Sequence, residues 1–147
     1  TILAGDVDPS ELLADDAAVA ATVEECLRIE APLHLFTRYA NEEVEIDDGV
    51  VLAPGEVVGL LYGAANRDPR RFADPDRFDP SRPDLGHVSF GGGIHHCIGA
   101  PLARIELQES LGVLFDRLPG LHLAGESRFR DIFHFHGLDH LPLAWRT

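Results

Sequence analysis

Residues 90–99 read Phe-Gly-Gly-Gly-Ile-His-His-Cys-Ile-Gly, and this segment constrains the interpretation of the rest of the chain. Three consecutive glycines let a backbone adopt positive φ angles and approach a flat ligand closely. Cys97 follows at the start of a predicted helix, where the helix dipole and free N–H groups favour a thiolate. A thiolate held in a rigid loop is suited to be a metal ligand or a nucleophile. The plainer alternative is a buried cysteine beside a glycine-rich turn.

Two helices are predicted, one on each side of a long irregular region. The second has Pro101 in its first turn and runs to about Leu118, ending before Pro119 and Gly120. The first begins at Asp15 or Asp16, which are good N-cap residues, and continues to Ile29. The apolar positions of the second helix are expected to form one buried face; they are Ile98, Leu102, Ile105, Leu111, Leu114, Phe115 and Leu118.

The segments between the helices change character twice. In residues 43–47 apolar and acidic side chains alternate, Asp48-Gly49 is a turn signal, and apolar runs follow at 50–52 and 57–61. Residues 42–62 therefore predict a short antiparallel sheet. Residues 66–86 contain four prolines and exclude regular structure, but Phe72 and Phe78 offer anchors that a solvated linker would lack. Residues 121–147 hold short strand-like pieces.

Composition narrows the classes of partner. The formal net charge of −13 argues against nucleic acid or an anionic membrane as a partner, because phosphates would repel the chain. No apolar run approaches the roughly 20 residues needed to span a bilayer. Two cysteines, Cys26 and Cys97, are more often kept reduced than bridged inside a cell. We therefore expect a soluble, cytoplasmic protein of one domain.

The cysteine segment resembles the haem-ligand loop of the cytochrome P450 family. The match consists of Phe90, Gly93, His95, Cys97 and Gly99, followed at once by a helix. This resemblance implies that Cys97 is the thiolate ligand to the iron of haem (iron protoporphyrin IX). It also implies that Phe90 packs near the ligand sulfur. His95 is expected to bond a haem propionate at a position where many relatives carry Arg.

Further segments resemble the same family in the same order, among them residues 65–72 and 103–106. Glu25 and Arg28 fit its Glu-x-x-Arg motif, and Asp76-Arg77-Phe78 fits its meander, so the resemblance implies a charged network of Glu25, Arg28 and Arg77. Arg38, in Phe36-Thr37-Arg38-Tyr39-Ala40, is expected to be the second propionate partner. A planar guanidinium that stays charged suits that task.

The resemblance implies a mixed α/β, mainly α fold, the C-terminal part of the cytochrome P450 architecture. It covers about residues 12–147, and complete members are much longer, so residues 1–147 are expected to be an incomplete haem-binding portion. The implied activity is a monooxygenase that inserts one atom of O2 into a small organic substrate. A ferredoxin-type redox partner with an NAD(P)H reductase would supply its electrons.

One functional element of the family is not matched. Residues 2–6 faintly resemble the start of the oxygen-binding helix, but Pro9 would interrupt that helix where an acid-alcohol pair should follow. We therefore expect no monooxygenation by this chain alone. A haem-binding or interaction module without oxygenase activity is the first alternative, and a non-haem Cys/His metal protein is the second.

Three sets of residues have competing interpretations. His134 and His136 alternate with Phe133 and Phe135, which favours an edge strand over a metal site. Cys26 is expected to be a small core residue. Four arginines could form a basic patch for an electron-transfer protein or could be scattered solvated side chains; they are Arg67, Arg70, Arg71 and Arg104.

Overall fold

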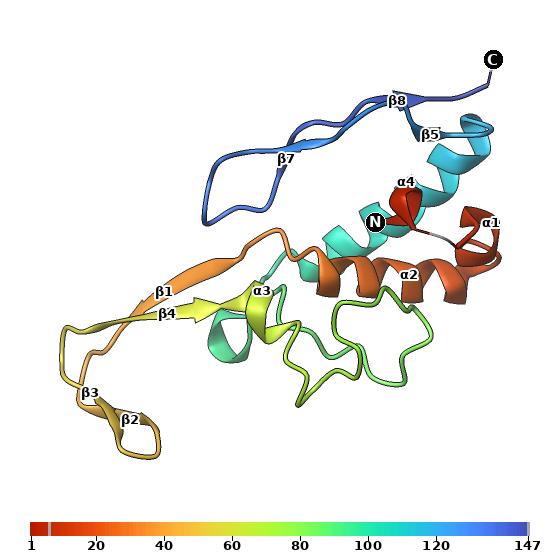
Figure 1. Cartoon of the computed structure of the whole chain (residues 1–147). Helices are drawn as coiled ribbons and strands as arrows, with labels where there is room; N and C mark the ends of the chain where they lie inside the picture. Colours follow the sequence, from red (N-terminus) through yellow and green to blue (C-terminus); the bar gives the residue numbers. More distant parts are fainter. Residues whose placement is uncertain (6, 147) are drawn as a thin grey trace.

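The computed structural model describes residues 1–5 and 7–146. Asp6, part of the segment compared above with an oxygen-binding helix, lies outside the described residues. Two helices pack at the centre of the molecule. Figure 1 shows an irregular meander on one side of them and a C-terminal hairpin on the other, with a long β-hairpin reaching away from the helices. The pair consists of α2 (Asp16–Ile29) and α4 (Ala100–Arg117). The mixed, small-sheet architecture that the sequence predicted is confirmed.

The two long helices begin and end where their capping residues predict. The Asp15 carboxylate accepts a hydrogen bond from the Ala18 N–H at 2.8 Å, which caps α2. Pro101 is the second residue of α4, where a missing N–H costs nothing. Gly120, at φ +68°, lies in the turn after α4. The remaining helical pieces are short: η1 (Ile2–Ala4), α1 (Pro9–Leu12), α3 (Tyr62–Ala65) and η2 (Gly93–His95).

The prediction of one buried face on α4 is wrong. Within the helix only Ala100 is buried, while Leu102 and Ile105 are 59% and 57% exposed, and Ile98 just before it is fully exposed. α4 packs against α2 along one side. Leu111 and Phe115 are half-buried beside a cavity that residues of the C-terminal strands also line. Among residues 1–5 and 7–146 nothing buries Leu102 and Ile105, so the apolar pattern identified a helix but not its neighbours.

In residues 1–5 and 7–146, four two-stranded antiparallel sheets form the β structure. The long hairpin pairs β1 (Leu35–Tyr39) with β4 (Val57–Leu61), and its tip pairs β2 (Val44–Asp47) with β3 (Val50–Leu52). Gly49, at φ +75°, makes the tip turn. The strands predicted within residues 42–62 are confirmed, but they do not form one sheet: β2 pairs with β3, whereas β4 pairs with β1, which was not predicted. The other two sheets pair β5 (His122–Leu123) with β8 (Leu143–Ala144) and β6 (Arg128–Phe129) with β7 (Leu138–His140).

The strand predicted around His134 and His136 is not a named strand of the structure. These residues lie in the loop between β6 and β7, with one isolated bridge between Leu33 and Phe135. The His136 ring stacks between the rings of His34 and Phe129, with centroids at 4.3 and 4.2 Å. Its Nε2 lies 2.7 Å from a Glu30 carboxylate oxygen. Two main-chain hydrogen bonds also hold this loop against residues 32–34: the His34 N–H donates to the His134 carbonyl at 3.0 Å, and the His136 N–H donates to the Pro32 carbonyl at 2.9 Å. The predicted extended pairing is therefore present, but only as a single bridge.

The meander lies against α2 through hydrogen bonds to buried polar groups. The Asn66 side chain donates to the Ser89 hydroxyl at 2.7 Å and accepts from the Val88 N–H at 2.8 Å. Ser89 in turn donates to the Leu27 carbonyl at 2.5 Å. Phe72 is buried as expected, and Phe78 is half-buried. The meander is therefore ordered without regular secondary structure, as its anchors predicted.

A buried ion pair fixes the meander to α2. The Arg28 guanidinium donates to both carboxylate oxygens of Glu25, at 2.7 and 2.8 Å, and both side chains are fully buried. Its other donors reach the main-chain carbonyls of Asn66 at 2.7 Å and Pro75 at 2.8 Å. The Asp79 N–H also donates to Glu25, at 2.8 Å. One side-chain pair thus satisfies carbonyl and amide groups from two parts of the meander.

The third charged member of this network is not Arg77, and that prediction is corrected. Only the Arg77 main-chain carbonyl takes part, accepting from Arg28 at 3.2 Å, while the Arg77 side chain is 69% exposed. Arg82 takes its place, because its Nε donates to Glu25 at 3.1 Å and its side chain is 8% exposed. Arg82 also donates to the carbonyls of Asp74 and Arg77, at 2.7 and 2.8 Å. The motif Asp76-Arg77-Phe78 located the right loop but the wrong guanidinium.

Glu25→Ala should lower the free energy of unfolding by about 3–5 kcal/mol, because Arg28 is left as an uncompensated buried charge. Arg82→Ala should destabilise the chain clearly, whereas Arg77→Ala should change little. Urea unfolding followed by circular dichroism measures all three. Asp68→Ala, which breaks the exposed pair with Arg70, is the control. Equal losses in Arg77→Ala and Arg82→Ala would contradict this assignment of the network.

Candidate functional site

The loop that carries Cys97 is closed by its own main-chain hydrogen bonds. The Cys97 N–H donates to the Phe90 carbonyl at 2.8 Å, and the His96 N–H donates to the Gly93 carbonyl at 3.1 Å. Gly91 and Gly93 have φ angles of +72° and +59°, in the left-handed region where side chains are strained. The Ala100 N–H then donates to the Cys97 carbonyl at 3.2 Å, which joins the loop to α4.

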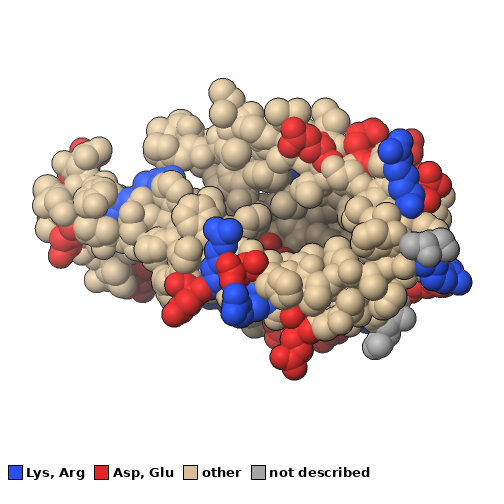
Figure 2. Space-filling view, turned by 90° about the horizontal axis from the view of Figure 1, so that it is seen from above, with Lys and Arg blue, Asp and Glu red and all other residues tan. Residues whose placement is uncertain are grey.

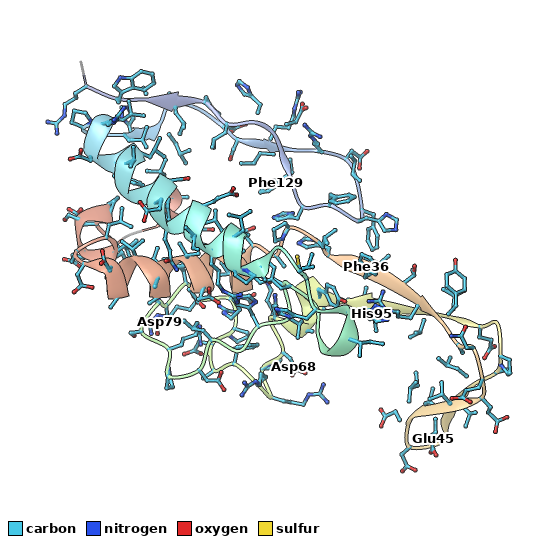
Figure 3. All side chains as sticks on the ribbon, turned by 180° about the vertical axis from the view of Figure 1, so that it is seen from behind. Phe36, Glu45, Asp68, Asp79, His95 and Phe129 are labelled. Carbon is cyan, nitrogen blue, oxygen red and sulfur yellow. The ribbon has the colours of Figure 1, made fainter. Side chains whose placement is uncertain are left out.

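Cys97 lines a cavity of about 360 Å³ at the junction of this loop with β1 and α3. Its walls come from three segments that are distant in sequence; the lining residues are Pro32, Leu33, Phe36, Arg38, Tyr62, Ser89, Phe90, Gly91, His95 and Cys97. Figure 3 shows Phe36 and His95 close together, where β1 passes the loop, and Glu45 far away at the hairpin tip. The lining is apolar except for a thiol, a guanidinium, an imidazole and two hydroxyls.

Four of the six residues expected at the cofactor are brought together here: Cys97, His95, Arg38 and Phe90. Gly93 and Gly99 shape the loop and the start of α4 without lining the cavity. A Cβ on Gly99 would lie 3.8 Å from the Cys97 sulfur, an ordinary contact. Glu25 and Arg28 also lie outside the cavity, where they hold the meander to α2.

Arg38 is the cationic side chain of the cavity wall. It is half-buried, its Nη1 donates to the Thr37 carbonyl at 2.9 Å, and its guanidinium lies 4.7 Å from the centroid of the Phe36 ring. β1 pairs Arg38 with Val58 of β4, so the strand fixes its starting position. An anionic group in the cavity would meet this positive charge.

Sequence reasoning missed the residues that complete the cavity. Leu33 precedes β1 and Tyr62 begins α3 directly after β4, so the β1–β4 pairing brings them to one end of the hairpin. A Cβ on Gly91 would lie 3.4 Å from the Tyr62 hydroxyl, which shows how closely this loop packs. The only sequence signal for Tyr62 was its position, as an aromatic residue directly after the strand predicted at residues 57–61.

The two cysteines lie in different environments. Cys97 is exposed, whereas Cys26 is partly buried on α2 beside a second apolar cavity of about 440 Å³. Burial raises the pKa of the Cys26 thiol to about 11, so this thiol stays protonated and unreactive at neutral pH. Cys97 is therefore the cysteine available to a ligand.

A second polar cluster lies behind the loop. Arg104 of α4 donates to both carboxylate oxygens of Glu24 on α2, at 2.6 and 2.9 Å. The Arg104 guanidinium also lies 4.6 Å from the centroid of the Phe90 ring. Burial opposes ionisation of Glu24, but the hydrogen bond and charge of Arg104, together with the hydrogen bond of His87, outweigh it and lower the Glu24 pKa.

His87 completes this cluster in a defined tautomer. Its Nδ1 accepts from the Ser89 N–H at 3.2 Å, so in the neutral ring the proton lies on Nε2, which is 3.2 Å from Glu24. The His87 side chain is 1% exposed, and burial lowers its pKa although Glu24 acts in the opposite direction. We therefore assign His87 as a neutral donor to Glu24.

The arginines that could have formed a free basic patch are each bonded to a carboxylate. Arg67 pairs with Asp76, Arg70 with Asp68, Arg71 with Asp84 and Arg104 with Glu24, at 2.5–2.6 Å. Figure 2 shows blue side chains beside red ones on the face it presents, around a hollow whose visible walls are mostly uncharged. Nearest-neighbour carboxylates thus offset the positive charge of these four residues.

Within the described parts of the chain, no three His, Cys, Asp or Glu side chains are grouped to hold a metal ion. A non-haem Cys/His centre therefore has no ligand set there. None of the described helices is long and apolar enough to cross a membrane.

The chain belongs to the cytochrome P450 family. The sequence profile described as Cytochrome P450 matches residues 11–133. The biotin biosynthesis cytochrome P450 of Bacillus subtilis is 46% identical over 128 residues, which are 86% of this chain and 32% of that protein. The 6-deoxyerythronolide B hydroxylase of Saccharopolyspora erythraea is 47% identical over 132 residues, covering 88% of this chain and 32% of that enzyme.

Solved structures agree with this assignment. The structure of CYP164A2 from Mycobacterium smegmatis superposes with a TM-score of 0.90 at 36% identity, covering 97% of this chain and 36% of that one. P450BioI, solved in complex with an acyl carrier protein that carries hexadec-9Z-enoic acid, gives a TM-score of 0.86 at 44% identity. The chain thus spans about a third of the length of the relatives it matches.

Stability should fall as the pH decreases from about 7 toward 5, and His87 should account for part of this fall. The folded-state pKa of His87 is lowered below the ordinary 6.5. As the pH falls below 6.5, the unfolded chain therefore binds a proton at His87 before the folded chain does, and this favours unfolding. The contribution of His87 is complete above pH 6.5 and is lost as the pH falls below it. Urea unfolding between pH 7.5 and 5 measures the slope.

His87→Gln keeps an N–H donor near Glu24 but cannot titrate, so its slope should be shallower than that of the parent. His34, whose pKa burial also lowers, contributes in the same direction and should account for part of the remaining slope. An unchanged slope in His87→Gln would mean that His87 is protonated in the folded chain.

Proposed function

We propose that residues 1–147 are a haem-binding C-terminal portion of a cytochrome P450 monooxygenase, which inserts one atom of O2 into a small organic substrate. The observation that carries this proposal is the position of Cys97 in an apolar cavity that also contains Arg38 and His95. Family membership supplies the reaction class, and the name of the Saccharopolyspora relative describes a hydroxylase.

The residues present fit a haem group. When bound, haem supplies the iron centre at which O2 is reduced and activated. The Cys97 thiolate would hold the iron, and the positive φ angles of Gly91 and Gly93 let the loop pass close to a flat ring. Arg38 offers a cation to the anionic propionates, and His95, the last residue of η2, offers a hydrogen-bond donor. Phe36 and Phe90 supply apolar contact.

Cys97→Ala should abolish the strongly red-shifted Soret band that thiolate-ligated haem gives in the ferrous-CO state. The reason is that no other described thiol lines the cavity. Cys26→Ser is the matched control and should retain the band, because Cys26 lies beside a different cavity. A red-shifted band that persists in Cys97→Ala would place the ligand elsewhere and defeat the assignment.

The expected partners follow from the same proposal. A ferredoxin-type protein and an NAD(P)H reductase would deliver electrons to the iron, and the chain would work in the cytoplasm, where thiols stay reduced. The acidic surface disfavours nucleic acid and anionic membranes. Because Arg70, Arg71 and Arg104 are bonded to carboxylates, a redox partner that used these arginines would have to displace the pairs or bind elsewhere.

A haem-binding or interaction module without oxygenase activity is the second candidate function. Three exposed side chains favour this candidate: those of Cys97, Ile98 and Ile94. In the described part of the chain no segment covers the loop on that side. Oxygen activation needs a closed, water-poor pocket, and an apolar surface of this kind instead invites association.

The 147-residue chain, supplied with haem, ferredoxin, reductase and NADPH, should consume NADPH and release peroxide without forming oxygenated product. The physical reason is that water reaches the exposed side of the site. Product analysis over a broad substrate panel, with peroxide measured in parallel, tests this expectation. Product formed in proportion to NADPH would establish oxygenase activity in the chain and remove the second candidate.

A further inference from the structure

The Phe90 ring is fixed by contacts that the haem assignment does not use. Its backbone carbonyl accepts the Cys97 N–H at 2.8 Å, so Phe90 and the ligand cysteine are the two ends of one closed loop. Its ring is half-buried and lies under the Arg104 guanidinium, at 4.6 Å from the ring centroid. The position of the ring and the closure of the cysteine loop are therefore linked through one residue.

Arg104 is held over this ring from α2. Glu24 accepts two hydrogen bonds from it, which orients the planar guanidinium, and neutral His87 bonds to the same carboxylate. The side chains of Arg104 and Glu24 are 33% and 22% exposed, so water screens the contact only partly. A chain of contacts thus runs from α2 through Glu24, Arg104 and Phe90 to the amide of Cys97.

We propose that Arg104 is a positioning residue: anchored by Glu24, it holds the Phe90 ring and so keeps the Cys97 loop closed. The effect of Arg104 on bound haem rests on the proposed function: if the loop opens more often, the Cys97 thiolate is held less uniformly against the iron. The inference about the loop concerns contacts within the chain and does not depend on a bound group.

Hydrogen–deuterium exchange of the Cys97 amide, followed by NMR on the full chain, tests this proposal directly. Arg104→Gln should make this amide exchange on the order of tenfold faster, because a partly buried cation–π contact has been lost. Exchange of the α2 amides should change much less. If the Cys97 and α2 amides accelerate by the same factor, the ion pair only supports global stability and the proposal is overturned.

The chain contains a matched control for this variant. Arg71 also bonds a carboxylate, Asp84 at 2.5 Å, and also lies over a phenylalanine, with its guanidinium 5.7 Å from the centroid of the Phe72 ring. Arg71→Gln removes the same kind of contact at a place that does not touch the cysteine loop. It should change Cys97 exchange less than twofold, and a larger effect would overturn the specific role of Arg104.

A double-mutant cycle separates the ring from the charge. In Phe90→Leu the guanidinium has no ring to hold, so adding Arg104→Gln should not accelerate Cys97 exchange further. Additive effects of the two changes would overturn the proposal. Glu24→Gln removes the anchoring charge with little change of shape and should give an intermediate acceleration.

A haem-dependent measurement distinguishes this inference from the proposed function. In chain loaded with haem, Arg104→Gln should shift the midpoint potential of the iron, whereas Arg71→Gln should not. If the parent chain takes up no haem, the proposed function fails and the exchange results still decide the role of Arg104. If haem binds through Cys97 and Cys97 exchange is unchanged in Arg104→Gln, only the positioning role fails.

Discussion

The buried pair of Glu25 and Arg28 is the interaction on which the remaining structure depends. Two fully buried charges on one helix are costly unless all their donors and acceptors find partners. Those partners are carbonyl and amide groups of the meander, which has no regular hydrogen-bonding pattern of its own. Helix α2 therefore acts as a rigid support, and the meander's conformation is set by where it can satisfy this pair.

The same helix also positions the cysteine loop, through the residue that precedes Glu25. Glu24, adjacent to Glu25 in sequence, points to α4 and bonds Arg104, while Glu25 bonds the meander. Consecutive acidic residues on α2 thus hold two different elements: Glu24 holds α4, which follows the cysteine loop, and Glu25 holds the meander. Because both contacts originate in the same turn of α2, the loop and the meander are positioned relative to one rigid element.

The sequence was sufficient for the helices and for most of the site, because capping residues and the spacing from Phe90 to Gly99 are local signals. It was insufficient where long-range packing decides. Nothing in the pattern distinguishes Arg77 from Arg82, since both are arginines in the same irregular loop and only the fold decides which guanidinium reaches Glu25. Likewise, Tyr62 and Phe36 meet the loop only because β1 and β4 pair in one register.

The exposed face of α4 shows where a periodic pattern and a structure diverge for a physical reason. Apolar residues repeat along a helix when something covers them, and a pattern read from the chain includes every such surface. In the described residues one side of α4 packs against α2, while Leu102 and Ile105 remain largely exposed. Cys97 and Ile98, which directly precede α4, are exposed as well. A segment that covered this end of the helix would therefore also limit the access of water to the cavity. The packing at the start of α4 and the chemistry of Cys97 therefore depend on the same covering segment.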